Sequence, residues 1–331
     1  MNVVLPLASS ALSLLFAAMV FDQWWQRRRA FQAVWALGLL WFGVSTGAEF
    51  LGGAFGWNPS IYRVYYLFGV FLVPSYLGAG TVYLLGKTRF GYFVAASIAL
   101  GGVLSLAVSS KYTGSAVAGV ITFAIALAVA AAVAAATAYR RELQGHTAMA
   151  SLAVGTLVVA ALVVTARISG AYVDPATHAP VAAGFPGYLR VSSFPFTVGG
   201  GLALVFGALY SAYIYMPKRR MLPARLAVVA IAVNFVASLP GALQALLRGR
   251  LNSRVPATIL IAVGAFIPGL TSSLNRLGIT WATFLGEFLG VLLIFVGFLV
   301  SEEVFSNLRL GRTIWSRRAV MYSALNEREA G

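Results

Sequence analysis

What this sequence lacks most clearly is charge. Charged residues make up only 10% of the 331 residues, whereas a soluble domain carries about 25%. Hydrophobic residues make up 60%, and the mean hydropathy is +0.85. This composition excludes a soluble protein and predicts an integral membrane protein. The net charge of +15 does not indicate nucleic-acid binding, because the basic residues form short clusters between apolar stretches, as membrane topology signals do.

Cysteine is absent, and histidine and lysine are scarce. Without cysteine there is no disulfide, no thiolate metal site and no cysteine nucleophile. His146 and His178 fall in predicted loops on opposite sides of the membrane, which argues against a haem held by two histidines of one chain. The lysines Lys87, Lys111 and Lys218 lie at predicted span ends or in loops. A retinal-type Schiff base within the membrane is therefore excluded.

Several enzyme motifs are missing as well. The sequence has no H-E-x-x-H, no P-loop and no G-x-G-x-x-G. The adjacent acidic residues Glu302 and Glu303 follow the last apolar stretch and do not form a paired motif for a magnesium-bound diphosphate. We therefore expect that the protein is not an enzyme, and we predict no catalytic residue, no metal and no cofactor.

Nine apolar stretches are long enough to cross a hydrocarbon core of about 30 Å. They cover residues 3–21, 31–51, 62–86, 90–109, 115–139, 148–169, 193–216, 256–275 and 281–300. Basic clusters follow the first, third, fifth and seventh stretches. Because cytoplasmic loops are rich in Lys and Arg, this pattern predicts a bacterial plasma-membrane protein with its N-terminus outside and its C-terminus in the cytoplasm.

These stretches predict an all-α fold, a single polytopic transmembrane helix bundle over residues 1–301. It has about nine spans plus one re-entrant or interfacial segment. Residues 302–331 are predicted to form a basic cytoplasmic tail. Pro74 predicts a kink in the third span. Residues 170–192, rich in Gly and Pro, are predicted to form the longest outer loop.

The segment 224–247 is long enough to cross the membrane, but a crossing would place the arginines that follow it outside. That contradicts the charge pattern of every earlier loop. A re-entrant segment that turns at residues 238–241 would return them to the cytoplasm, and we favour this interpretation over a tenth span. The next stretch, 256–275, has only twelve apolar residues before Pro268. We expect its outer third to be unwound or lined by polar groups.

Three stretches resemble a family of uncharacterised bacterial multi-span integral membrane proteins. They are RVYYLFGVFLVPSYLGAGTVYLL (63–85), LALVFGALYSAY followed by PKRR (202–220), and the last hairpin (259–300). The resemblance implies an integral membrane protein and no known activity, so it assigns no functional residue. In that family PKRR leads almost directly into the last hairpin, which implies that residues 222–254 are an insertion.

Glu287 is the one charged residue within the last apolar stretch. A carboxylate at that depth costs about 2.5–3.5 kcal/mol on insertion scales and normally faces protein or water. We predict that Glu287 faces the bundle interior with a polar partner. An arginine is the first candidate, the polar residues within 271–276 at the end of the preceding span are close in sequence, and Arg63 or Glu49 could reach it from across the bundle. The role of Glu287 is either ligand binding or structural. Gly286 and Gly290, on either side of it, indicate close helix packing.

The other candidate residues gather at the predicted outer side: Glu49, Arg63, Tyr66, Asn275 and Arg276. With Glu287 they predict a ligand-binding site in a polar cavity open to the outside. The alternative for the arginines is that they reach interfacial water. The resulting hypothesis is a transporter or small-ligand-binding permease. Two alternatives stay open, an accessory or scaffold subunit of a larger membrane complex and a membrane sensor. The expected partners are the lipid bilayer and other membrane subunits, with no nucleic acid.

Overall fold

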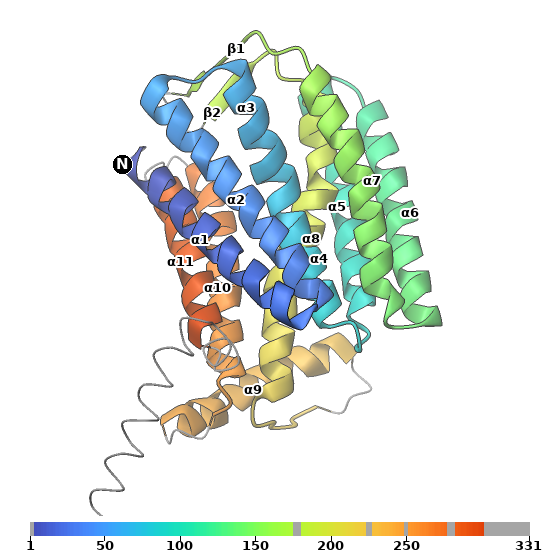
Figure 1. Cartoon of the computed structure of the whole chain (residues 1–331). Helices are drawn as coiled ribbons and strands as arrows, with labels where there is room; N and C mark the ends of the chain where they lie inside the picture. The colour runs from blue at the N-terminus through green and yellow to red at the C-terminus, as the bar shows by residue number, and fades with distance from the viewer. Residues whose placement is uncertain (1–2, 175–179, 223–226, 248–250, 277–281, 301–331) are drawn as a thin grey trace, which may run out of the picture. The chain divides into compact units, whose positions relative to one another are not determined.

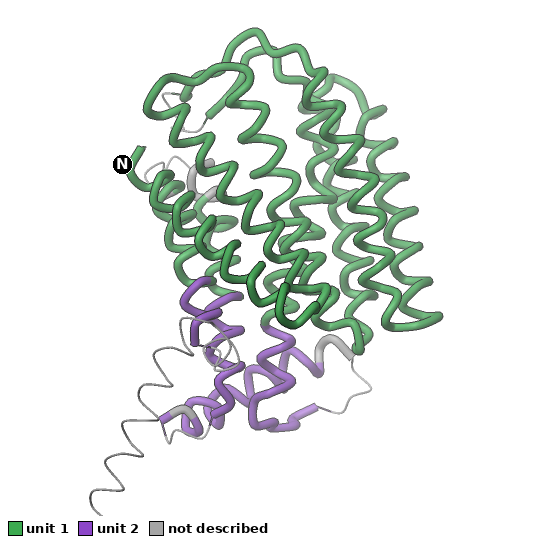
Figure 2. The backbone as a smooth tube through the Cα atoms, in the orientation of Figure 1, with its two compact units in different colours: residues 1–208, 262–294 green, residues 209–261, 295–331 purple. Residues whose placement is uncertain are grey.

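The computed structural model describes residues 3–174, 180–222, 227–247, 251–276 and 282–300. The predicted tail, 302–331, lies outside these residues. The chain divides into two compact units (Figure 2). Unit 1 consists of Met1–Ala208 and Ala262–Ile294, and unit 2 of Leu209–Ile261 and Phe295–Gly331.

Helices account for nearly all of the described residues (Figure 1). They are α1 (Val4–Arg27), α2 (Ala30–Phe55), α3 (Pro59–Tyr65), the π-helix η1 (Tyr66–Leu72), α4 (Val73–Leu84), α5 (Phe90–Thr113), α6 (Val117–Tyr139), α7 (Leu143–Thr165), α8 (Gly187–Tyr215), α9 (Ala227–Leu247), α10 (Arg254–Arg276) and α11 (Ala282–Val300). Within the described ranges, nine helical segments are long and apolar enough to span a membrane, with α3, η1 and α4 together forming one of them. The predicted all-α fold with about nine spans is confirmed.

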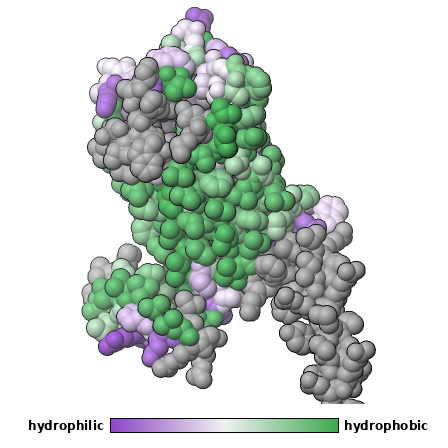
Figure 3. Space-filling view, turned by 90° about the vertical axis from the view of Figure 1, so that its left-hand side faces the viewer, coloured by the Kyte–Doolittle hydropathy of each residue, from purple (hydrophilic) through white to green (hydrophobic). Residues whose placement is uncertain are grey.

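Apolar side chains cover the outside of unit 1 as well as its interior. On the face shown in Figure 3, its middle is hydrophobic, and hydrophilic residues gather at the end with the β-hairpin. Exposed residues on α6 and α7 include Val117 at 63%, Leu157 at 74% and Val164 at 65%. So much exposed apolar surface would be unfavourable in water. It fits helices whose backbone groups bond internally and whose side chains face lipid.

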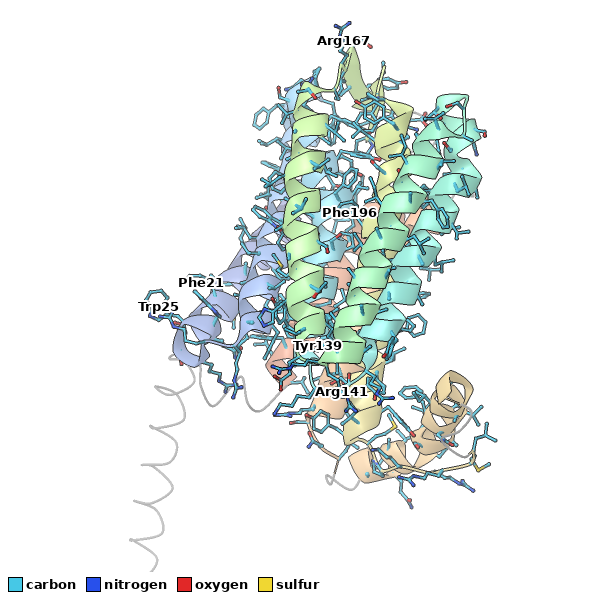
Figure 4. All side chains as sticks on the ribbon, turned by 90° about the vertical axis from the view of Figure 1, so that its right-hand side faces the viewer. Phe21, Trp25, Tyr139, Arg141, Arg167 and Phe196 are labelled. Carbon is cyan, nitrogen blue, oxygen red and sulfur yellow. The ribbon has the colours of Figure 1, made fainter. Side chains whose placement is uncertain are left out.

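Arginines are found at both ends of unit 1. Arg141, just after α6, lies at the end opposite Arg167, which follows α7 (Figure 4). The turn between α1 and α2 places the Arg28 guanidinium over the rings of Trp24 and Trp25, 5.0 and 4.4 Å from their centroids. Aromatic residues and arginines are typical of the membrane–water boundary.

Residues 170–192, predicted as a loop, are partly structured. Strand β1 (Gly170–Val173) pairs antiparallel with β2 (Pro180–Ala183). Helix α8 then begins at Gly187, six residues before the predicted start of the span. The hairpin is attached to the bundle by Phe185, whose ring lies 4.5 Å from that of Tyr66.

Two predictions about helix interruptions are wrong. Helix α9 continues through residues 238–241, where we expected the turn of a re-entrant segment. Helix α10 continues past Pro268 to Arg276, so the first alternative for its outer third, unwinding, does not occur. The second alternative, a lining of polar groups, stays a prediction, because the side chains of residues 272–276 lie outside the described part of the structure. Neighbouring residues compensate for a proline inside a membrane helix, so its position alone does not mark a helix end.

The third span shows such compensation beside α8. Pro74 has no N–H to donate to the Val70 carbonyl, and Thr197 Oγ1 of α8 donates to that carbonyl at 3.2 Å. The two helices approach closely at Gly78 and Gly200. A Cβ on Gly78 would lie 2.5 Å from the Gly200 carbonyl oxygen, which excludes a side chain at this position. Close packing of small residues is a common way to join membrane helices.

Candidate functional site

The structure brings together Glu49 of α2 and Glu287 of α11. Their carboxyl groups lie within hydrogen-bonding reach of each other. Glu49 is 3% exposed, and Glu287 is half-buried. Ionised carboxylates only accept hydrogen bonds, so a hydrogen bond between the two groups requires a proton on one of them. The pair is therefore suited to hold a proton, or to bind a cation in place of one.

Both carboxyl groups lie at a similar depth. Glu49 is six residues before the end of α2, and Glu287 is five residues after the start of α11. At 1.5 Å per residue, each is about 8–9 Å along its helix from that end. This depth is inside the apolar part of a span. An ionisable residue there is a candidate for an ion or substrate pathway.

One oxygen of the pair is without a partner. Glu49 Oε2 is buried and accepts no hydrogen bond from any residue that the structure describes. The hydroxyl of Thr283, one turn before Glu287 on α11, is also buried without a described partner. Buried polar groups are nearly always hydrogen-bonded in folded proteins. These two atoms on the helices of the pair are therefore available for a hydrogen bond to a ligand or water.

Tyr65 lies near this pair, since its hydroxyl group interacts electrostatically with both Glu49 and Glu287. It is the last residue of α3, immediately before the π-helix η1. Ser45 of α2 donates a 3.2 Å hydrogen bond to the Tyr65 carbonyl. The helix that carries Glu49 is thus bonded to the third span at the start of its π-helical segment. Such segments are frequent at functional sites.

Tyr65 was not among the predicted site residues, whereas Tyr66 was. Tyr62 and Tyr66 are four residues apart and lie on one face of the helix, where their rings stack at 5.9 Å. Tyr65 is displaced from that face. Helical spacing could have separated Tyr65 from the other two, but it could not have shown which face meets the carboxyl groups.

Arg63 and Tyr66 make other contacts. Arg63 Nη2 donates a 2.8 Å hydrogen bond to the Ala166 carbonyl after α7. Tyr66 is within hydrogen-bonding reach of Ser193 and interacts with Arg190. Tyr66 therefore belongs to an aromatic cluster near the β-hairpin. Among the described residues, the partner of Glu287 is the carboxyl group of Glu49.

Asn275 and Arg276 are the last two residues of α10. Their side chains lie outside the described part of the structure, so their predicted role stays a prediction. The two helices of the last hairpin, α10 and α11, pack closely against each other. A Cβ on Gly286 would collide with the Thr271 side chain of α10, and one on Gly290 would lie 2.8 Å from the Gly264 carbonyl oxygen. The predicted close packing at Gly286 and Gly290 is confirmed.

A separate cavity of about 1380 Å³ lies among α4, α5, α6, α7 and α8. Alanine, valine, isoleucine and glycine dominate its lining, and no charged side chain takes part. Phe196 of α8 lines it and lies in the space between α6 and α7 (Figure 4). None of the six predicted site residues lines this cavity. Its chemistry suits an apolar chain and not a polar solute.

Two arrangements that carry catalysis in other proteins are absent from the described residues. They contain no group of three or more His, Asp or Glu side chains placed to hold a metal ion. The spacing Gly43-x-Ser45-x-Gly47 matches a hydrolase motif in letters only. Ser45 lies inside α2, whereas that motif needs a sharp strand-to-helix turn to expose its serine.

The helices and their lipid-facing surfaces define the class: an integral multi-span membrane protein. No family model, no curated protein and no solved structure matches the chain. The predicted resemblance to a bacterial membrane-protein family therefore stays a prediction, and the site must be interpreted from its own chemistry.

Proposed function

We propose that this protein is a membrane transporter that binds a proton or small cation at the Glu49–Glu287 pair. The observation that carries the proposal is the approach of the buried Glu49 and the half-buried Glu287, whose carboxyl groups come from different spans, α2 and α11. Placing two like charges together in a membrane is unfavourable unless a proton or cation is bound between them. Binding and release of that ion therefore change the interaction between the two helices.

The surroundings of the pair support a coupled movement. Glu49 is on the helix that bonds to Tyr65 through Ser45. Tyr65 interacts with both carboxyl groups and precedes the π-helix η1. When the ion leaves, repulsion between the carboxylates acts on α2 and α11, and it also reaches the third span through these contacts. Transporters commonly use irregular helix segments beside such ion sites.

The predicted outward-facing polar cavity is part of the proposal. The pair lies toward the end of α2 at which the sequence predicts the outside, and the unpartnered Glu49 Oε2 offers an acceptor to an entering ion. An accessory subunit or a sensor, the two alternative functions, would not need ion exchange at this pair. Ion-dependent charge movement therefore distinguishes the proposal from both.

The test is a charge-movement measurement on purified protein reconstituted in liposomes on a solid-supported membrane. Rapid jumps of pH, Na⁺ or K⁺ are applied to the wild type and to Glu49→Gln, Glu287→Gln and the double variant. Glutamine keeps the size and can still donate a hydrogen bond, but it cannot exchange a proton. We expect a transient current with one of the three ions in the wild type, reduced at least tenfold in each variant.

The matched control is Glu142→Gln, because Glu142 is an exposed carboxylate just before α7. This variant should retain the wild-type current. Gel filtration of every variant establishes that the protein is folded. If the wild type gives no current with any of the three ions, or if the double variant keeps it, the proposed function is wrong.

A further inference from the structure

Helix α9 resolves the question that the sequence left open about residues 224–247. We propose that α9 lies flat on the membrane surface at the side where α8 ends, with its apolar stripe inserted between anionic lipid headgroups. The stripe consists of Val236, Leu239, Leu243 and Leu247. This inference concerns unit 2 alone and does not depend on the proposed transport function.

The first observation is that the apolar stripe has no protein cover. Val236 is 63% exposed, Leu243 58% and Leu247 80%. These residues recur at helical spacing and lie on one side of α9. An exposed stripe of large apolar side chains on an amphipathic helix is the usual signature of a helix in the membrane interface.

The opposite side of α9 faces its own unit. It carries Ala230, Asn234, Ser238 and Ala242, which are buried and follow one another at intervals of four residues. Ala242 packs in an apolar cluster with Ala212 and Met216 at the end of α8 and Val255 at the start of α10. The two polar members of this side both have partners.

These partners are in the basic segment that follows α8. Asn234 Oδ1 accepts hydrogen bonds from the backbone N–H groups of Met221, at 2.7 Å, and Leu222, at 3.0 Å. Ser238 Oγ accepts one from the Arg219 N–H at 2.9 Å. Residues 219–222 are therefore held against the middle of α9.

This attachment excludes a membrane-spanning α9. Asn234 and Ser238 are near the middle of Ala227–Leu247, which in a span would be the centre of the bilayer. The bonds would then bring the exposed side chains of Arg219 and Arg220, and an irregular backbone, into the hydrocarbon core. Neither is tolerated there without protein cover. A re-entrant segment with its deepest point at residues 238–241 would meet the same obstacle.

Charge identifies the occupant of this surface. Lys218, Arg219 and Arg220 are exposed beside α9, and a cluster of basic residues next to an apolar helix face favours anionic lipids. A second protein would also cover the stripe, but the basic residues match a negatively charged leaflet. The sequence predicts that this is the cytoplasmic side.

Single cysteines in this cysteine-free chain allow a direct test. Spin labels are placed at Val236, Leu243 and Leu247, and at Gln244, which is exposed beside the stripe. The protein is held in nanodiscs of phosphatidylcholine with phosphatidylglycerol. We expect the three stripe labels to be at one shallow depth, more accessible to oxygen than to a water-soluble nickel chelate, with the reverse preference at Gln244. Depth that changes steadily from Val236 to Leu247 would mean a span, and equal chelate access at all four positions would mean no insertion.

Two further measurements complete the test. A membrane-impermeant maleimide should label Met221→Cys and Asn252→Cys from the same side of sealed vesicles, and labelling from opposite sides would overturn the proposal. The double variant Arg219→Gln/Arg220→Gln keeps the backbone bond to Ser238. In this variant, the spin label at Val236 should reach the same depth in nanodiscs with and without phosphatidylglycerol. In the protein that keeps both arginines, the same label should lie deeper when phosphatidylglycerol is present. If phosphatidylglycerol changes the label depth equally in both proteins, anionic headgroups are excluded as the partner of these arginines.

Discussion

Ser105 of α5 donates a 2.8 Å hydrogen bond to the Val191 carbonyl of α8. Pro195, four residues after Val191, lies inside α8 and has no N–H to offer that carbonyl. A hydroxyl from one span therefore completes the backbone bonding of another. The same arrangement joins Thr197 to Val70 before Pro74. Two prolines thus become points of attachment between helices.

Ser105→Ala should lower the stability of the bundle, because the Val191 carbonyl loses its donor in a region without water. Hydrogen bonds between membrane helices contribute about 0.6–2 kcal/mol, so we expect a loss of that size. It is measured by thermal unfolding in detergent. Ser110→Ala is the control, since Ser110 is exposed on the same helix. Equal unfolding temperatures for the two variants would contradict the role of this bond.

Adjacent glycines of α8 give a sharper comparison. A Cβ on Gly200 would collide with the Pro74 carbonyl, whereas nothing lies within 4 Å of a Cβ on Gly201. Gly200→Ala should destabilise the protein by about 1–3 kcal/mol through overpacking, and Gly201→Ala should be neutral or slightly stabilising. Thermal unfolding of the two single variants makes the comparison. A neutral Gly200→Ala would show that α4 and α8 do not approach as described.

The Glu49–Glu287 pair should hold at least one proton in the absence of a bound cation, because two ionised carboxylates within hydrogen-bonding reach of each other repel. Infrared spectroscopy of the purified protein in Na⁺- and K⁺-free buffer near neutral pH should show the C=O stretch of a buried protonated carboxyl group. The band should disappear in the double variant Glu49→Gln/Glu287→Gln and remain in Glu142→Gln. An unchanged spectrum in the double variant would rule out a shared proton.

Glu287 also allows the functional and structural roles to be separated. Glu287→Gln preserves size and hydrogen bonding, so we expect folded protein with lost ion-dependent charge movement. Glu287→Leu leaves Glu49 buried without its partner, and we expect a lower yield and a lower unfolding temperature. Gel filtration measures the yield of folded protein, and thermal unfolding in detergent measures the unfolding temperature of each variant. If the leucine variant is as stable as the glutamine variant, Glu287 has no structural role.

An odd number of spans places the two ends of the chain on opposite sides of the membrane. With nine spans and a surface-bound α9, reporter fusions should place the N-terminus outside and the C-terminus in the cytoplasm. Alkaline phosphatase is active only outside, and green fluorescent protein fluoresces only inside. Ends on the same side would require an even number of spans, and α9 would then be the first candidate for a tenth.

The number and position of the spans follow from the sequence because hydrophobicity and length are local properties. Each of the nine predicted stretches overlaps a helix that is long and apolar enough to cross a membrane. The suspicion that Glu287 is special also came from local information, a single carboxylate in an apolar stretch. From sequence, Glu49 was only one of several candidate partners for that carboxylate, with an arginine as the first. Glu49 is at the other end of the chain and reaches Glu287 only through packing of α2 and α11.

Tertiary structure also decided the course of the helices through their prolines. From sequence, Pro240 and Pro268 indicated breaks, yet α9 and α10 continue through both. The fate of a proline in a membrane helix depends on what the neighbouring elements provide for the freed carbonyl, as Ser105 does for Val191. Tertiary structure also decided that Asn234 and Ser238 bond to the backbone of the basic segment that follows α8. The sequence by itself therefore determined which nine stretches are long and apolar enough to cross a bilayer. Only tertiary contacts decided the course of α9 and which polar groups meet, because those bonds join residues on different elements.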